Sequence, residues 1–173
     1  MLDVRTQFLT SVEAVTLCFF LDRIISKPGN MISDFLYADL HFKLVLTFYV
    51  LLHLTVLFLD SKLVVQHAAL LFAAFGWAML LIITIHGSRL WHCLGVAAHC
   101  IGVFLFGMLR CAEYTSPWVE LISLDIGISL MLAFAYAYLV IIFSENAYIP
   151  QHALFLMAQA TYAVLVHFDP YVH

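Results

Sequence analysis

The chain alternates long apolar windows with short polar turns. No Lys, Arg, Asp or Glu occurs in four windows, at residues 63–88, 90–109, 126–144 and 146–168. A fifth window, at 40–59, contains only Lys43 near its start, from where a long side chain can reach the membrane surface. At a rise of about 1.5 Å per residue, each window can cross a bilayer as an α-helix. The pattern predicts five transmembrane helices, at residues 40–59, 63–86, 90–110, 118–143 and 149–168.

The N-terminal segment, residues 6–25, is ambiguous because Glu13 interrupts its apolar run and Asp22 and Arg23 close it. Its apolar side chains gather mainly on one side of a helix, which favours an amphipathic helix lying in the membrane interface. The alternative is a sixth transmembrane helix. With five spans, the distribution of Lys and Arg places the N-terminus inside, whereas six spans leave the orientation undecided.

Composition excludes a water-soluble fold. Apolar residues make up 65% of the 173 residues and charged residues only 10%, so a soluble globule could not cover its surface with polar groups. The short turns, such as residues 60–62, join antiparallel neighbours. We therefore expect residues 1–173 to form a single all-α integral membrane domain, a multi-pass helical bundle in contact with the bilayer and with bound lipids. The net charge of −4 and the scattered basic residues give no basic patch, which argues against a nucleic-acid partner.

Several polar residues in the predicted helices are candidates for chemistry. His53 and His67 flank the turn at Ser61 on neighbouring helices, roughly 9 to 12 Å below one membrane face. Asp125 follows Pro117 on that same face and has a similar depth. The three residues are a candidate metal or proton-relay cluster, since imidazole and carboxylate groups bind divalent ions and transfer protons. Alternatively, His53 bonds a neighbouring helix and Asp125 bonds Ser129 one turn away.

A second candidate site pairs His53 with His99 as axial ligands of a haem, because the two lie on non-consecutive helices. Gln159 is central in its helix and needs a hydrogen-bond partner there. Gly95, Ala98 and Gly102 are small residues that allow close helix packing, either within the bundle or against another chain. The four cysteines form no CxxC pair, so we interpret them as reduced packing residues.

No phosphate loop, nucleophile elbow, zinc-protease helix or ion-selectivity filter is present in the sequence. This absence and the short loops favour a non-catalytic accessory or structural subunit of a larger membrane complex, with other membrane subunits as partners. An energy-transducing membrane, such as the mitochondrial inner membrane, is the expected location. A small intramembrane protein that binds haem or a divalent metal, or that conducts protons through its histidines, is the alternative hypothesis. A lipid-modifying membrane enzyme is the third.

Overall fold

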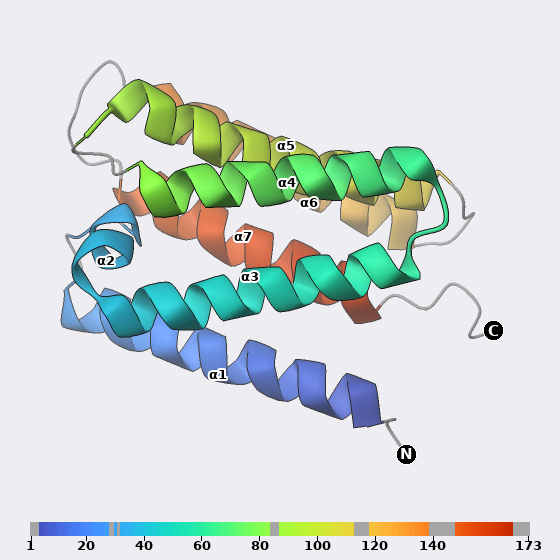
Figure 1. Cartoon of the computed structure of the whole chain (residues 1–173), viewed down its shortest axis with the longest axis horizontal. Coiled ribbons are helices and arrows are strands. Elements are labelled where there is room, and N and C mark those ends of the chain that lie inside the picture. Colours follow the sequence, from blue (N-terminus) through green and yellow to red (C-terminus); the bar gives the residue numbers. More distant parts are fainter. Residues whose placement is uncertain are drawn as a thin grey trace.

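The computed structural model describes residues 4–27, 30, 32–83, 87–112, 118–138 and 148–167. All elements in this part of the chain are α-helices, which confirms the predicted all-α class (Figure 1). They are α1 (Val4–Ser26), α2 (Ile32–Ala38), α3 (Leu40–Asp60), α4 (Val64–Ile82), α5 (Arg89–Cys111), α6 (Trp118–Tyr138) and α7 (Tyr148–His167). The long helices run side by side, and the short α2 lies at one end of the bundle (Figure 1).

Four of these helices, α3, α4, α5 and α7, are long and apolar enough to cross a membrane. They correspond to four of the five predicted spans, although residues 84–86 and 168 of those spans lie outside the described residues. The fifth predicted span begins as α6, and its last residues, 139–143, also lie outside. The four apolar helices fit a membrane protein. Among them α5 is the most buried.

Helix α1 runs antiparallel to α3 along the whole length of α3. Arg5 near the start of α1 pairs with Asp60 at the end of α3, and Arg23 near the end of α1 lies 3.0 Å from Asp39. These pairs define two ends of the bundle, which we call the Asp60 end and the Asp39 end. An interfacial helix would lie across an end of the bundle rather than along it. The favoured sequence prediction of an interfacial helix is thus not confirmed, and α1 is also not among the four helices that are long and apolar enough to cross a membrane.

The start of α3 is fixed by Asp39, whose carboxylate accepts a hydrogen bond of 3.1 Å from the backbone N–H of Phe42. Ser88 caps α5 in the same way by accepting from the N–H of Trp91 at 3.5 Å. Such caps satisfy backbone donors that have no partner inside the helix. These caps fix the starts of α3 and α5 next to the first residues of their apolar windows.

Helices α4 and α5 approach so closely that their backbones touch at glycines. A Cβ atom built on Gly102 would lie 2.5 Å from the backbone nitrogen of Ala73, and one on Gly76 would lie 2.3 Å from that of His99. A Cβ atom built on Gly95 would lie 3.2 Å from the side chains of Met79 and Leu80 on α4. The small residues of α5 therefore pack within the bundle, which was the first of the two predicted alternatives.

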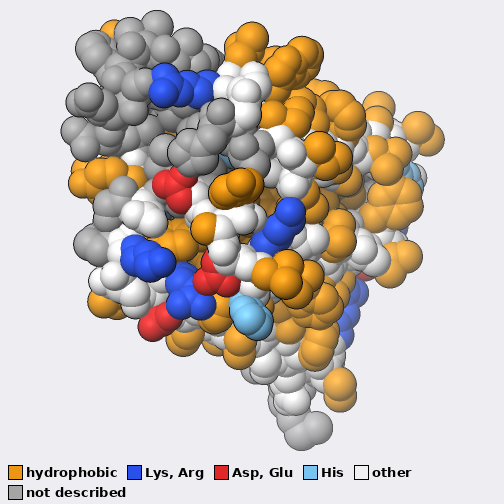
Figure 2. Space-filling model, turned by 60° about the vertical axis from the view of Figure 1, so that its left-hand side comes forward, with side chains coloured by type: hydrophobic (Ala, Val, Ile, Leu, Met, Phe, Trp, Pro, Cys, Tyr) orange, Lys and Arg blue, Asp and Glu red, His pale blue; other side chains and the backbone are white. Residues whose placement is uncertain are grey.

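Charged and apolar side chains separate on the surface. Arg23, Lys27, Asp34, Asp39 and His41 border a shallow hollow at the Asp39 end. Figure 2 shows charged side chains gathered on this end and apolar side chains spread over the adjoining flank. The outer faces of α3 and α4 expose large apolar side chains, among them Leu44, Phe48, Leu51, Phe72 and Phe75. A polar end and apolar sides suit a bundle whose sides contact lipid.

Candidate functional site

Glu13, in the middle of α1, is held between histidines from two other helices. Its Oε1 atom lies 3.1 Å from Nε2 of His53 on α3, and its Oε2 atom lies 3.0 Å from Nε2 of His167 on α7. The His53 side chain is fully buried, and those of Glu13 and His167 are 17% and 27% exposed. We call these three residues the Glu13 cluster. Among the described residues, the Glu13 carboxylate pairs with these histidines and with no Lys or Arg.

The hydrogen bonds of His53 determine how many protons the Glu13 cluster must hold. Nδ1 of His53 lies 2.8 Å from the carbonyl oxygen of Tyr49, and a carbonyl can only accept, so Nδ1 carries a hydrogen. In a neutral imidazole Nε2 would then be an acceptor, and an ionised Glu13 has no hydrogen to donate. The His53–Glu13 hydrogen bond therefore requires one additional proton, on Nε2 of His53 or on the Glu13 carboxyl group.

A second buried hydrogen bond joins α5 to α7. Nδ1 of His99 donates to the carbonyl oxygen of Ala73 at 2.9 Å, which leaves Nε2 as the acceptor in the neutral ring. The hydroxyl of Tyr162 lies 3.2 Å from that Nε2 atom and is its donor. His99 and Tyr162 are 7% and 1% exposed. We call them the His99–Tyr162 pair.

Aromatic contacts connect the Glu13 cluster to the His99–Tyr162 pair. The ring centroid of Tyr162 lies 5.5 Å from that of His53 and 6.1 Å from that of His99. Tyr49 packs against His53 at 4.1 Å and against Tyr162 at 6.0 Å. Ionisable and polar side chains therefore follow one another through the interior, from His167 near the Asp60 end to His99 deep in the bundle.

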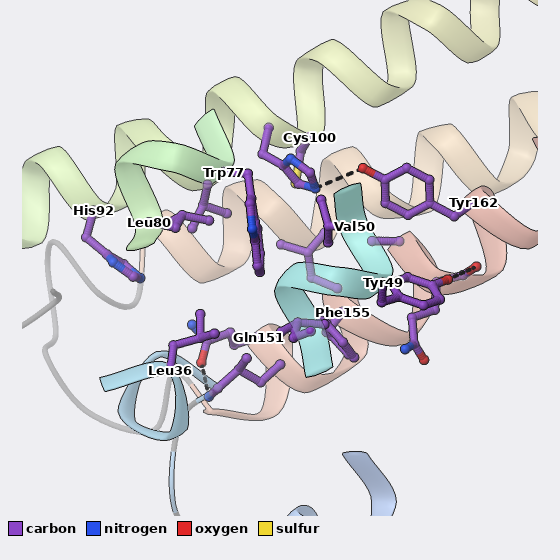
Figure 3. A pocket seen from close by; sticks show the side chains of 17 residues that line it. Leu36, Tyr49, Val50, Trp77, Leu80, His92, Cys100, Gln151, Phe155 and Tyr162 are labelled. Carbon is purple, nitrogen blue, oxygen red and sulfur yellow. Dashed lines mark hydrogen bonds between the residues drawn. The ribbon is translucent and has the colours of Figure 1, made fainter. Parts of the chain in front are cut away.

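A cavity of about 80 Å³ continues from the His99–Tyr162 pair toward the Asp39 end. Its walls come from α2, α3, α4, α5 and α7, and Figure 3 shows Trp77 and Tyr162 from opposite sides of this space. Gln151 lies at its α2 side, where the side-chain oxygen accepts from the backbone N–H of Ile32 at 2.7 Å.

The structure places the residues of the predicted metal or proton-relay cluster apart. His53 belongs to the Glu13 cluster, and Nε2 of His67 lies 3.2 Å from the carbonyl oxygen of Phe58 within its own hairpin. Asp125 accepts a hydrogen bond from the hydroxyl of Thr161 on α7, and not from Ser129. Within the described part of the chain, no group of three His, Cys, Asp or Glu residues is arranged to hold a metal ion. Similar depth did not bring these side chains together, because each faces a different neighbour.

The residues predicted to hold a haem, His53 and His99, have both ring nitrogens in hydrogen bonds. The ring of Tyr162 also contacts both imidazoles. An axial ligand must offer a free nitrogen to the iron. Haem binding would therefore require both histidines to give up a hydrogen bond and Tyr162 to move.

Sequence reasoning did not assign a role to Glu13, His167 or Tyr162. In the sequence, Glu13 marks only an interruption of an apolar run. The available signal was the cost of a carboxylate inside an apolar helix, which makes such a residue a functional candidate. Its partners lie 40 and 154 positions away, so no local pattern could identify them.

The chain matches no family model, no curated protein and no solved structure. Its function is therefore inferred from the side chains inside the bundle.

Proposed function

We propose that this chain is a multi-pass membrane protein that transfers protons across the bilayer through the Glu13 cluster and the His99–Tyr162 pair. The observation that carries the proposal is the His53–Glu13 hydrogen bond, which requires a proton in the interior of an apolar bundle. Ionisable groups are costly inside a membrane and commonly mark proton or ion pathways. Imidazole and carboxyl groups exchange protons near neutral pH.

We propose that α1 crosses the membrane, together with α3, α4, α5, α6 and α7. Helix α1 has 23 residues beside the 21 of α3, and ion pairs join the two helices at both ends. A helix that stays beside a transmembrane neighbour over its full length occupies the same depth of the bilayer. Six crossings place the start of α1 and the end of α7 on the same side of the membrane, consistent with their common end in Figure 1.

The proposed path begins at His167, which is part-exposed at the end of α7, and passes through Glu13 to His53. It continues through the His99–Tyr162 pair to the cavity and the Asp39 end. Each of these side chains both donates and accepts a proton, as a relay requires. Between His53 and Tyr162 the rings are in contact, and a water molecule or a ring rotation completes the transfer there.

The prediction of a non-catalytic subunit of a larger complex stays a prediction, as do its organelle and its partner subunits. The exposed apolar faces of α3 and α4 suit lipid and protein equally well. No observation on the described residues favours a lipid-modifying enzyme. Proton transfer is the function with a specific set of contacts in its support.

The proposal is tested by proton flux in phosphatidylcholine vesicles that contain the purified protein and an internal pH-sensitive dye, with a potassium diffusion potential as the driving force. We expect wild-type vesicles to change internal pH and Glu13→Gln vesicles to do so at least tenfold more slowly. The amide of Gln can donate to a neutral His53, so the variant keeps the hydrogen bond and loses the exchangeable carboxyl proton.

Asp22→Asn is the matched control, because it makes the same chemical change on α1 at a side chain that is 64% exposed. It should conduct like the wild type. Equal flux from wild type, Glu13→Gln and protein-free vesicles would refute proton transfer. If Glu13→Gln conducts as fast as the wild type while protein-free vesicles do not conduct, Glu13 is not part of the path.

A further inference from the structure

The cavity beside the His99–Tyr162 pair also has the properties of a ligand site. Its described lining contains no Lys, Arg, Asp or Glu. Most of the wall is aliphatic or aromatic, with Val50, Leu154 and Phe155 as examples. A molecule bound there would be neutral and largely apolar, because this wall offers no opposite charge to an ion.

Two buried donors in this wall have no acceptor among the described residues. They are Nε1 of Trp77 and the side-chain nitrogen of Gln159. The residues are 5% and 9% exposed, so bulk water does not cover them. A buried donor without an acceptor is costly, and an acceptor that reaches it from the cavity removes this cost. Trp77 projects into the space that the labelled side chains of Figure 3 surround.

We infer that the cavity binds a neutral, mainly apolar molecule that carries carbonyl-type oxygen acceptors. The oxygens would accept from Trp77 and Gln159. The aromatic rings of Tyr49, Trp77 and Tyr162 line the same space and suit a flat ring. None of the three residues of the Glu13 cluster lines this cavity, and ligand binding here is measured independently of proton flux.

The fluorescence of Trp77 provides a direct binding assay. The chain has three tryptophans, and a Trp91→Phe, Trp118→Phe variant keeps Trp77 as the single reporter. In phosphatidylcholine nanodiscs, we expect tetramethyl-1,4-benzoquinone to quench this reporter along a saturable curve. A Trp77→Phe, Trp118→Phe variant keeps only Trp91, which is 54% exposed on the outside of the bundle, and should show linear quenching by quinone dissolved in the lipid.

Recognition of the oxygens is tested with a ligand of the same shape. Tetramethylbenzene lacks both carbonyl groups, so it should compete with the quinone at least tenfold more weakly. In the Trp77 reporter background, Gln159→Leu should weaken quinone binding at least tenfold by removing one donor. Ala158→Phe, which places a ring in the cavity wall, should abolish saturable quenching.

Three outcomes would overturn the inference. Linear quenching of Trp77, like that of Trp91, would mean that the cavity takes no such ligand. Equal competition by tetramethylbenzene, or unchanged affinity in Gln159→Leu, would mean that the oxygens are not recognised. The comparison of the two ligands needs no substitution in the cavity wall, so it decides the matter even if the cavity variants fail to fold.

Discussion

Replacing a single glycine hydrogen by a methyl group should separate α4 from α5. In Gly102→Ala the new Cβ atom would lie 2.5 Å from the backbone nitrogen of Ala73 and 2.6 Å from the backbone oxygen of Ala69. Carbon atoms normally approach other heavy atoms to about 3.5 Å, so the contact is short by roughly 1 Å. The clashing atoms belong to backbone, which cannot move aside by changing a rotamer. The two helices must therefore move apart.

The expected cost follows from two opposing effects. Overpacking of a close contact destabilises by about 1–3 kcal/mol, while Ala is favoured over Gly in a helix by about 1 kcal/mol. Because separating α4 and α5 also loosens the contacts along the rest of this interface, we expect a net loss of at least about 1 kcal/mol. Gly127→Ala on α6 is the matched control, since its Cβ atom would meet nothing within 4 Å. That variant should be as stable as wild type or gain up to about 1 kcal/mol.

The assay is unfolding in mixed micelles with increasing sodium dodecyl sulfate, followed by circular dichroism. Gly102→Ala should unfold at a lower detergent fraction than wild type, and Gly127→Ala at an equal or higher one. Gly76→Ala presses directly on the backbone of His99, so it should also reduce proton flux by displacing His99 from Tyr162. If Gly102→Ala and Gly127→Ala unfold at the same detergent fraction, the close α4–α5 contact is wrong.

Two further predictions concern the ends of the bundle. The hydrogen bond from the N–H of Phe42, together with the charge of Arg23, lowers the pKa of Asp39. The ionised Asp39 carboxylate therefore stabilises the fold above about pH 4, and this stabilisation is lost as the pH falls through the lowered pKa. Asp39→Ala should cost about 1 kcal/mol at pH 7 and show a smaller acid-dependent loss than wild type in the mixed-micelle assay. In a cysteine-free background, single cysteines added before residue 4 and after residue 167 should react with a membrane-impermeant maleimide from the same side. Labelling from opposite sides would contradict a membrane-spanning α1.

Much of the fold was predictable because charge is so costly in a membrane. A window of about 20 residues with no charge, or with only Lys43 near its start, has few alternatives to a helix in a membrane, so α3, α4, α5 and α7 follow from the sequence. The orientation of α1 did not follow. Glu13, Asp22 and Arg23 argue for an interfacial position. Among the described residues, the burial of Glu13 is compensated by His53 and His167, which come from distant parts of the chain.

The candidate site was only partly predictable, because depth can be counted along a helix but rotation cannot. Each residue turns a helix by about 100°, so an error of one residue moves a side chain to another face. His53 is fully buried and bonds Glu13, whereas His67 bonds Phe58 and Asp125 bonds Thr161. The predicted need of Gln159 for a partner is informative, since none of the described residues accepts from its side-chain nitrogen.

The central claim is that the His53–Glu13 contact holds a proton inside the membrane. Solid-state NMR of the protein in lipid bilayers, with ¹⁵N-labelled histidine and ¹³C-labelled glutamate, measures the protonation of both groups in one sample. We predict at pH 7 either a His53 ring with hydrogens on both nitrogens or a protonated Glu13 carboxyl group. In Glu13→Gln, His53 should become a neutral ring with its hydrogen on Nδ1. A neutral His53 beside an ionised Glu13 in the wild-type protein would contradict the claim.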